Sequence, residues 1–171
     1  MINLKPALES PRLFRYHCCV ILCLLLAQLV PVQVAGLWNI SGIWNMVLVD
    51  TTSGKFLLIG VSQEQAAALQ QGLSGLPTPR PMTHDLFLQT LDSTGWSVSR
   101  VVINQLKNDV FYARLILKGH GKRLSLDARP SDALNIAVRA PCPVFVEKSV
   151  LESFYQELRK AIQAPTPVQT I

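Results

Sequence analysis

Two stretches far apart in the chain each place an arginine, a proline and carboxylates just before or within the start of a predicted helix. The first runs from Arg80 to Asp85 (RPMTHD), and the second runs from Asp127 to Asp132 (DARPSD). The start of a helix attracts anions because its first N–H groups have no intrahelical partners. An arginine beside it adds a planar donor that suits phosphate. The two stretches therefore indicate a site for a phosphate-bearing ligand, provided that they meet in space.

The acidic residues of the two stretches are candidates for catalysis. Asp85, Asp127 and Asp132, with His84, would offer oxygen ligands and one imidazole, a set that suits Mg²⁺ or Mn²⁺. A metal held there stabilises the attacking and leaving oxygens of a phosphodiester. The alternative is structural, because aspartates near helix starts commonly cap the helix and pair with a nearby arginine. From residue types alone this structural alternative is the commoner one, and both stay open.

The second stretch is predicted to form a strand-to-helix turn. Leu124 and Leu126 alternate with polar residues as they would in a half-buried strand. Pro130 ends the strand because it has no N–H and a fixed φ, and it suits the first position of a helix. The residues that follow form one helical stripe, made of Ala133, Leu134, Ala137 and Val138.

The first stretch follows a proline-rich connector, Leu76 to Pro81 (LPTPRP), and is predicted to open a helix with Thr83 as its N-cap. Gly95 would close that helix. An earlier helix is predicted behind a capping box that runs from Ser62 to Gln65, in which each side chain bonds the backbone N–H of the other residue.

Strands and helices alternate irregularly, which predicts an α+β fold with a mixed, largely antiparallel sheet packed by about four helices. Three consecutive strands separated by short turns predict an antiparallel meander. Strands are expected at 32–43, 46–50, 56–61, 98–104, 110–118, 122–127 and 143–147.

The first residues differ in character from the rest. Lys5, Arg12 and Arg15 precede an apolar run from Cys18 to Val30, the order found in targeting signals. A targeting peptide, a membrane anchor and a poorly ordered extension remain alternatives, and the compartment is not fixed. We expect residues 1–31 to form this segment, 32–163 the domain and 164–171 a loose tail. The net charge of +5 is mildly basic and carries no signature of a partner.

Five segments together resemble the bifunctional nuclease domain family, over roughly residues 34–152. The most specific are RPMTHDLF (80–87) and LDARPSDALNIAVR (126–139), with FYARLIL (111–117), LLIGVSQEQAAAL (57–69) and CPVFVEKSVLE (142–152) in the family's order and spacing. One departure is that residues 57–62 lack the proline and tryptophan that the family usually carries there.

The resemblance implies an α+β domain, often a homodimer, with nuclease activity on DNA and RNA as described for plant members. Together with the helix starts it favours a metal-assisted phosphodiesterase. The alternative is a non-catalytic dimeric binding or scaffold module in which the Arg and Asp residues form structural ion pairs. A membrane contact through the N-terminal segment is a further expectation.

The site residues are expected within the two helix starts. The expected catalytic residues are His84, Asp85, Asp127 and Asp132, and the expected metal ligands are Asp85, Asp127 and Asp132. The expected substrate-binding residues are Arg80, Thr83, Arg129 and Ser131.

Overall fold

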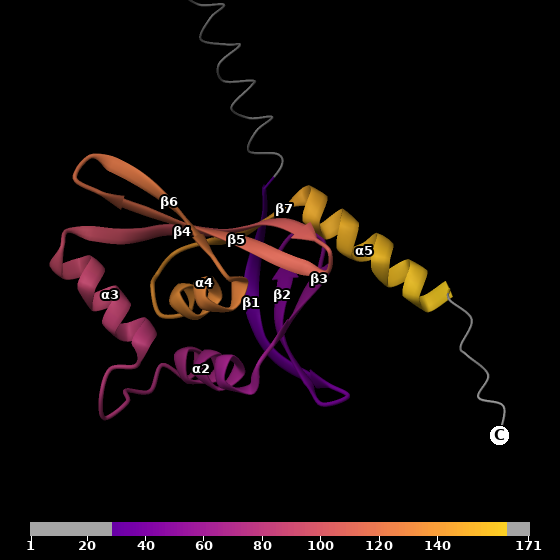
Figure 1. Ribbon diagram of the computed structural model, residues 1–171, viewed down its shortest axis with the longest axis horizontal. Helices are drawn as coiled ribbons and strands as arrows, with labels where there is room; N and C mark the ends of the chain where they lie inside the picture. Colours follow the sequence, from indigo (N-terminus) through magenta and orange to yellow (C-terminus); the bar gives the residue numbers. More distant parts are fainter. Residues whose placement is uncertain (1–28, 164–171) are drawn as a thin grey trace, which may run out of the picture.

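Residues 29–163 are described by a computed structural model, in which one seven-stranded sheet carries three helices against one face (Figure 1). The elements are β1 (Leu29–Ile40), β2 (Ile43–Asp50), β3 (Phe56–Val61), α2 (Gln63–Ser74), α3 (Thr83–Ser93), β4 (Trp96–Lys107), β5 (Val110–Gly119), β6 (Lys122–Ala128), α4 (Pro130–Ala137), β7 (Val144–Glu147) and α5 (Lys148–Gln163). Helices α2, α3 and α4 lie on that face, whereas α5 begins against β7 and β4 and projects to the side.

The sheet joins two antiparallel halves through one short strand. Its order is β3-β2-β1-β7-β4-β5-β6, and every neighbouring pair is antiparallel except β4 with β7, which is parallel. The α+β fold and the β4–β5–β6 meander are therefore confirmed. Because α2 follows β3 in the first half and α4 follows β6 in the second, the helix layer bridges both halves.

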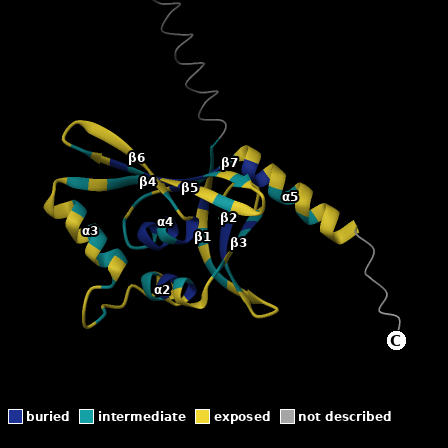
Figure 2. Cartoon of the chain, viewed as in Figure 1, coloured by how far each residue is buried: buried dark blue, intermediate teal, exposed yellow. Residues whose placement is uncertain are grey.

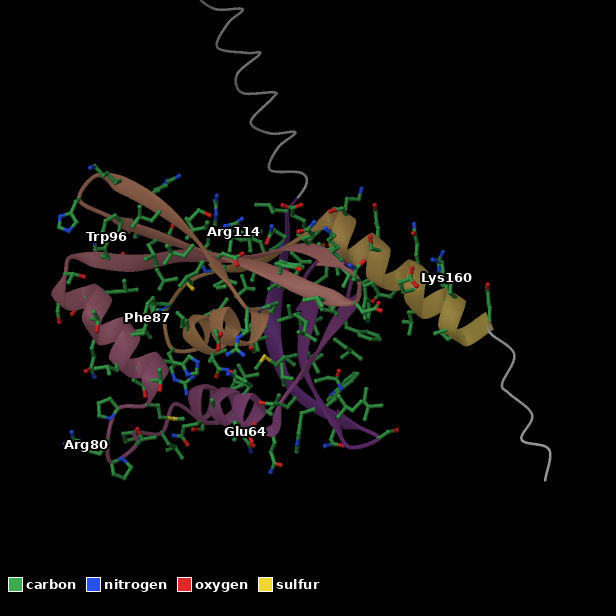
Figure 3. All side chains as sticks on the ribbon, in the orientation of Figure 1. Glu64, Arg80, Phe87, Trp96, Arg114 and Lys160 are labelled. Carbon is green, nitrogen blue, oxygen red and sulfur yellow. The ribbon has the colours of Figure 1, made fainter. Side chains whose placement is uncertain are left out.

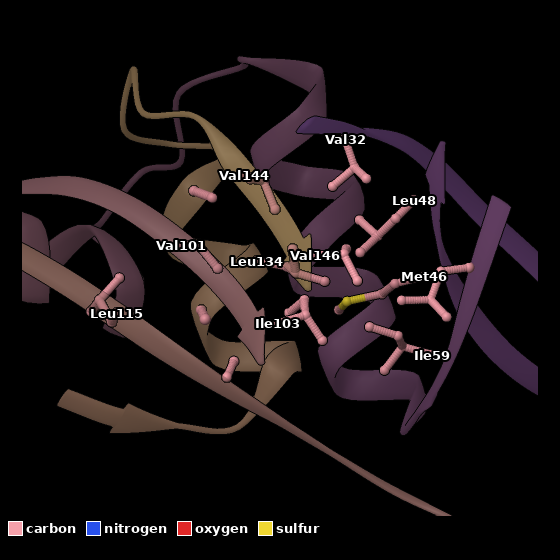
Figure 4. Packing of buried hydrophobic residues seen from close by; sticks show 14 of the residues in the cluster. Val32, Met46, Leu48, Ile59, Val101, Ile103, Leu115, Leu134, Val144 and Val146 are labelled. Atoms are coloured by element: carbon pink, nitrogen blue, oxygen red, sulfur yellow. The ribbon is translucent and has the colours of Figure 1, made fainter. Parts of the chain in front are cut away.

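Helix α4 is the centre of the core. Seven of its residues are buried, and Leu134 is fully enclosed beside Ile103 of β4 and Val146 of β7 (Figure 4). Met46 of β2 completes this cluster from the other half of the sheet. Colouring by burial shows α4 as the darkest helix, while α3 and α5 are largely exposed (Figure 2). Burial on this scale fixes the position of α4 and of the seven side chains that it buries.

The predicted starts of the helices are mostly confirmed. Pro130 occupies the first turn of α4, and the Ser62 hydroxyl accepts a hydrogen bond from the Gln65 N–H at 3.4 Å. The prediction of Thr83 as an N-cap was wrong, because the N-cap of α3 is Met82, whose N–H donates to the Asp85 carboxylate at 2.9 Å. Thr83 is instead the first residue of α3, and Asp85 at the third helical position accepts the N-cap N–H.

The ends of the described region bear on the predicted domain limits. Strand β1 begins at Leu29 and pairs with β7 from that residue, so three residues of the expected N-terminal segment belong to the sheet. The rest of that segment and the expected tail lie outside the described residues. Between Leu29 and Gln163, none of the helices has the length and apolar character needed to cross a membrane.

The turn between β2 and β3 is organised by a buried carboxylate. Asp50 is 6% exposed and accepts hydrogen bonds from the N–H and hydroxyl groups of Thr52 and Ser53. Burial alone would raise the pKa of Asp50, but these hydrogen bonds outweigh burial and lower the pKa from 3.8 to about 2. The ionised form is therefore favoured in the folded protein.

Replacing Asp50 should destabilise the fold in a pH-dependent way. Since its folded pKa is lowered, its contribution of about 2 kcal/mol is present above pH 4 and is lost as pH falls toward 2. Asp50→Ala should lower the free energy of unfolding at pH 7, and its difference from the wild type should shrink at pH 3. Urea unfolding at both pH values measures this. Asp92→Ala, at an exposed aspartate near the end of α3, is the matched control.

Candidate functional site

The two predicted helix starts meet, and a third joins them. His84 in the first turn of α3 places its Nε2 4.0 Å from Oδ1 of Asp132 in the first turn of α4. Gln65 in the first turn of α2 donates from Nε2 to the same oxygen at 3.2 Å. Three helix starts, far apart in the sequence, thus surround one carboxylate. We call Gln65, His84, Arg129 and Asp132 the Asp132 cluster.

Arg129 binds the Asp132 carboxylate through two N–H groups of its guanidinium. Its Nε donates to Oδ2 at 2.7 Å, and its Nη2 donates to Oδ1 at 3.1 Å. The Asp132 side chain is 32% exposed, whereas that of Arg129 is 72% exposed. The guanidinium therefore reaches solvent and retains N–H groups that can bind an incoming anion. Of the predicted substrate-binding residues, Arg129 has the geometry best suited to phosphate.

Asp85 lies beside the Asp132 cluster, among the starts of α2, α3 and α4, which we call the polar corner. It has a structural partner that the sequence did not indicate. Its Oδ1 accepts from Nε of Arg139 at 3.0 Å, and the Arg139 side chain is only 8% exposed. The other N–H groups of that guanidinium donate to backbone carbonyls of Asn135 and Ala68 at 2.9 and 2.8 Å. Arg139 thus ties α2, α3 and α4 together, and Asp85 belongs to this tie.

A buried amide connects the two carboxylates. Asn135 is fully buried, and its side-chain N–H groups donate to the Gln65 side chain at 3.1 Å and to the Ser131 carbonyl at 2.9 Å. Its Oδ1 accepts from Arg139 at 3.3 Å. Sequence analysis missed Asn135 and Arg139. The only available signal was a polar residue and a charged residue, four positions apart, beside the apolar stripe of α4.

His84 is the titratable group at the centre of this corner. Its side chain is 14% exposed, and its Nδ1 is buried without a hydrogen-bond partner among the described residues. Burial and then the charge of Arg139 lower the pKa of His84, while Asp132 and Asp85 act in the opposite direction. The lowering effects prevail, so the imidazole is neutral at pH 7 and can accept a proton.

Two of the predicted site residues lie elsewhere. Asp127 is 73% exposed, and its carboxylate lies 4.0 Å from Arg114 of β5. Because Arg114 alternates with the buried Ala113 and Leu115, this pair lies on the sheet face opposite α4. Arg80 is exposed on the loop before α3, away from α4 (Figure 3).

The carboxylates do not form the metal site that the sequence predicted. Both oxygens of Asp132 accept from Arg129, and those of Asp85 accept from Arg139 and the Met82 N–H. Across residues 29–163 no three His, Cys, Asp or Glu side chains are grouped closely enough to hold a metal ion. The donor set therefore does not fit a three-aspartate metal centre, and the Mg²⁺ or Mn²⁺ dependence stays a prediction.

Two pockets adjoin this corner. One of about 470 Å³ lies on the Arg139 side, with Asp85 and Gly72 in its wall. The other, of about 440 Å³, lies on the Arg129 side and is also lined by Gln65 and Ser131. The predicted residues Thr83 and Ser131 differ in their surroundings, because Thr83 is exposed whereas Ser131 is 9% exposed in the wall of the second pocket. The polar corner is thus open to ligands on two sides.

The sequence match places the described domain in a known family. Residues 46–158 match the bifunctional nuclease domain, and the chain belongs to that family. The matched region contains all four residues of the Asp132 cluster and also Asn135 and Arg139.

Relatives come from bacteria and plants. An uncharacterized protein of Mycobacterium tuberculosis is 36% identical over 106 residues, which cover 62% of this chain and 63% of the relative. Bifunctional nuclease 1 of Oryza sativa subsp. japonica is 31% identical over 121 residues, 69% of this chain and 35% of the relative. Bifunctional nuclease 1 of Arabidopsis thaliana is 28% identical over 118 residues, covering 67% and 36%. The matched region thus spans about a third of the plant proteins.

Removing the Arg139 guanidinium should destabilise the domain strongly. Arg139→Met leaves Asp85 and two backbone carbonyls without their donor, so we expect a loss of about 3 kcal/mol or more in the free energy of unfolding. Arg129→Met, at an exposed ion pair, should cost less than about 1 kcal/mol. Urea unfolding compares the two variants. Equal losses would contradict the assignment of Arg139 as the structural tie and Arg129 as free for ligands.

The titration of His84 can be observed directly. The midpoint of its ring-proton NMR shift should lie below 6.5, and the His84→Gln spectrum assigns the resonance. Because the neutral imidazole is favoured in the folded state, stability should fall as pH drops below 6.5. A midpoint at or above 6.5 would show that the two carboxylates, and not burial and Arg139, dominate its environment.

Proposed function

We propose that this domain hydrolyses phosphodiester bonds of DNA or RNA at the Asp132 cluster. The observation that carries the proposal is a neutral, nearly buried imidazole held beside a carboxylate whose arginine partner remains open to solvent. Membership of the bifunctional nuclease domain family supports the reaction class. Plant relatives with the same domain bear the name bifunctional nuclease, which supports nucleic acid as the substrate class.

Arg129 would bind the phosphate through an exchange of partners. A phosphate that approaches its exposed guanidinium competes with Asp132 for the same N–H groups, because each anion offers two oxygens that can accept a pair of hydrogen bonds from one guanidinium. As Arg129 turns toward the phosphate, Oδ2 of Asp132 becomes available to orient a water molecule, while Oδ1 keeps its hydrogen bond from Gln65. Substrate binding would thereby free one carboxylate oxygen.

His84 would then act on the proton of the attacking water. A neutral imidazole with Nε2 facing Asp132 accepts a proton, and the carboxylate stabilises the imidazolium that forms. No step of this scheme uses the predicted Mg²⁺ or Mn²⁺, since the three aspartates do not form a common ligand set. The predicted homodimer and membrane contact also remain predictions.

The second candidate function is the non-catalytic module, and one observation favours it. Asp85 and Arg139 form a largely buried ion pair whose role in holding the helices together needs no catalytic explanation, as the structural alternative requires. If Asp132 and Arg129 play the same part, then their replacement would change stability and nothing else. The two candidates therefore differ in what Asp132→Asn does to activity at constant fold.

A nuclease assay on the purified full chain tests the proposal. Asp132→Asn and His84→Gln should each reduce cleavage of single-stranded DNA or RNA by about a hundredfold or more, as expected for loss of a proton-transfer group. Wild type and variants are assayed with EDTA, with Mg²⁺ and with Mn²⁺, which also tests metal dependence. Asp92→Asn is the matched control and should keep wild-type activity.

Thermal melts of the same samples separate catalysis from stability. Loss of activity at an unchanged melting temperature supports the catalytic assignment. Wild type that is inactive under all three conditions, or variants whose activity falls only with their melting temperature, would favour the scaffold module.

A further inference from the structure

The pocket on the Arg129 side combines polar and apolar lining residues, and a nucleotide needs both kinds of contact. The polar lining includes Arg129 and Ser131, and the apolar lining includes Val61 and Phe111. Asp109 also lines the pocket. We propose that this pocket binds one nucleotide of the substrate and prefers guanine. The inference rests on the proposed function, since it names the substrate unit that the Asp132 cluster would act beside.

The polar lining suits a phosphate. The exposed Arg129 guanidinium supplies charged donors, and Ser131 adds a hydroxyl from a residue that is 9% exposed. Within the described part of the chain, only the backbone carbonyl of Ser131 is engaged in the side-chain network, where it accepts from Asn135. A hydroxyl in the pocket wall can donate a hydrogen bond to a phosphate oxygen.

The apolar lining suits a base. Phe111 is partly buried, packs against the core and also lines the pocket, as does Val61. A base that stacks on an aromatic ring gains binding energy irrespective of its sequence identity. The pocket volume of about 440 Å³ lies within the range of small-molecule sites. The apolar lining would therefore supply affinity without discrimination among bases.

Asp109 supplies the discrimination. It is exposed in the turn between β4 and β5, where its φ of 61° holds the left-handed conformation. An ionised carboxylate only accepts hydrogen bonds, so it favours a base edge with adjacent donors. Guanine presents two neighbouring N–H donors, from its N1 and its amino group, whereas the other bases present an acceptor beside each donor. A guanine preference follows from this acceptor.

The pocket and the Asp132 cluster share two side chains. Gln65 and Arg129 line the pocket, and both also donate hydrogen bonds to Asp132. A nucleotide whose phosphate lies on Arg129 would thus bring a phosphodiester to the proposed catalytic group. The base pocket would select which phosphodiester along a strand is placed there.

Binding of mononucleotides to the full chain in EDTA tests the inference without relying on turnover. Calorimetric titration with 5′-GMP, 5′-AMP, 5′-CMP and 5′-UMP should show GMP binding about tenfold more tightly than the others, the size expected for a paired base contact. Asp109→Asn, which keeps the left-handed backbone accessible, should abolish the preference. Phe111→Leu should weaken all four nucleotides about fivefold or more through loss of stacking.

Two matched controls accompany these variants. Asp92→Asn removes an exposed carboxylate elsewhere, and Tyr112→Leu removes the neighbouring aromatic ring, which points to the opposite face of β5. Both should bind like the wild type. Equal affinities for the four nucleotides, no measurable binding, or an unchanged preference in Asp109→Asn would overturn the inference.

The outcomes also separate this inference from the proposed function. Selective GMP binding by a chain that cleaves no DNA or RNA supports the pocket and contradicts the nuclease proposal. Cleavage by a chain that shows no base preference in binding supports the nuclease proposal and contradicts the pocket.

Discussion

The arrangement of the helix layer depends on the nearly buried guanidinium of Arg139. A cation withdrawn from water requires partners for its N–H groups, and these come from Asp85 and from the carbonyls of Asn135 and Ala68. The partners lie on α2, α3 and α4, so the charge fixes three helices at once. Gly72 shows how close the approach is, because a Cβ there would lie 2.5 Å from the Arg139 Nη1.

This constraint explains why a polar corner can exist beside the central core. With the three helices held together, Asn135 donates to the Gln65 side-chain oxygen and thereby orients the Gln65 amide. The Gln65 side-chain N–H group then donates to Asp132. His84 is then enclosed by neighbours that were positioned for structural reasons. Its environment, and hence its neutrality, is a product of the same packing that stabilises the domain.

The fold followed from local signals, while the site required knowledge of tertiary contacts. The meander was predictable from the alternation of apolar and polar residues along β4, β5 and β6. The strand-to-helix turn after it was predictable from the proline at the start of α4. Both features depend on neighbours in sequence. Gln65 was expected to complete a capping box but bonds Asp132 and Asn135 instead. Asp127 and Asp132 are close in sequence, yet strand alternation turns Asp127 to the opposite face, and only the register with β5 shows this.

Strand β7 has only four residues, yet it alone joins the two halves of the sheet. It is also the last strand along the chain, and α4 comes only just before it. During synthesis, a ribosome-bound chain would therefore complete its first hairpins long before the helix starts could be locked around Arg139. The polar corner around Asp132 would thus be completed late, at about the time when the final strand enters the sheet.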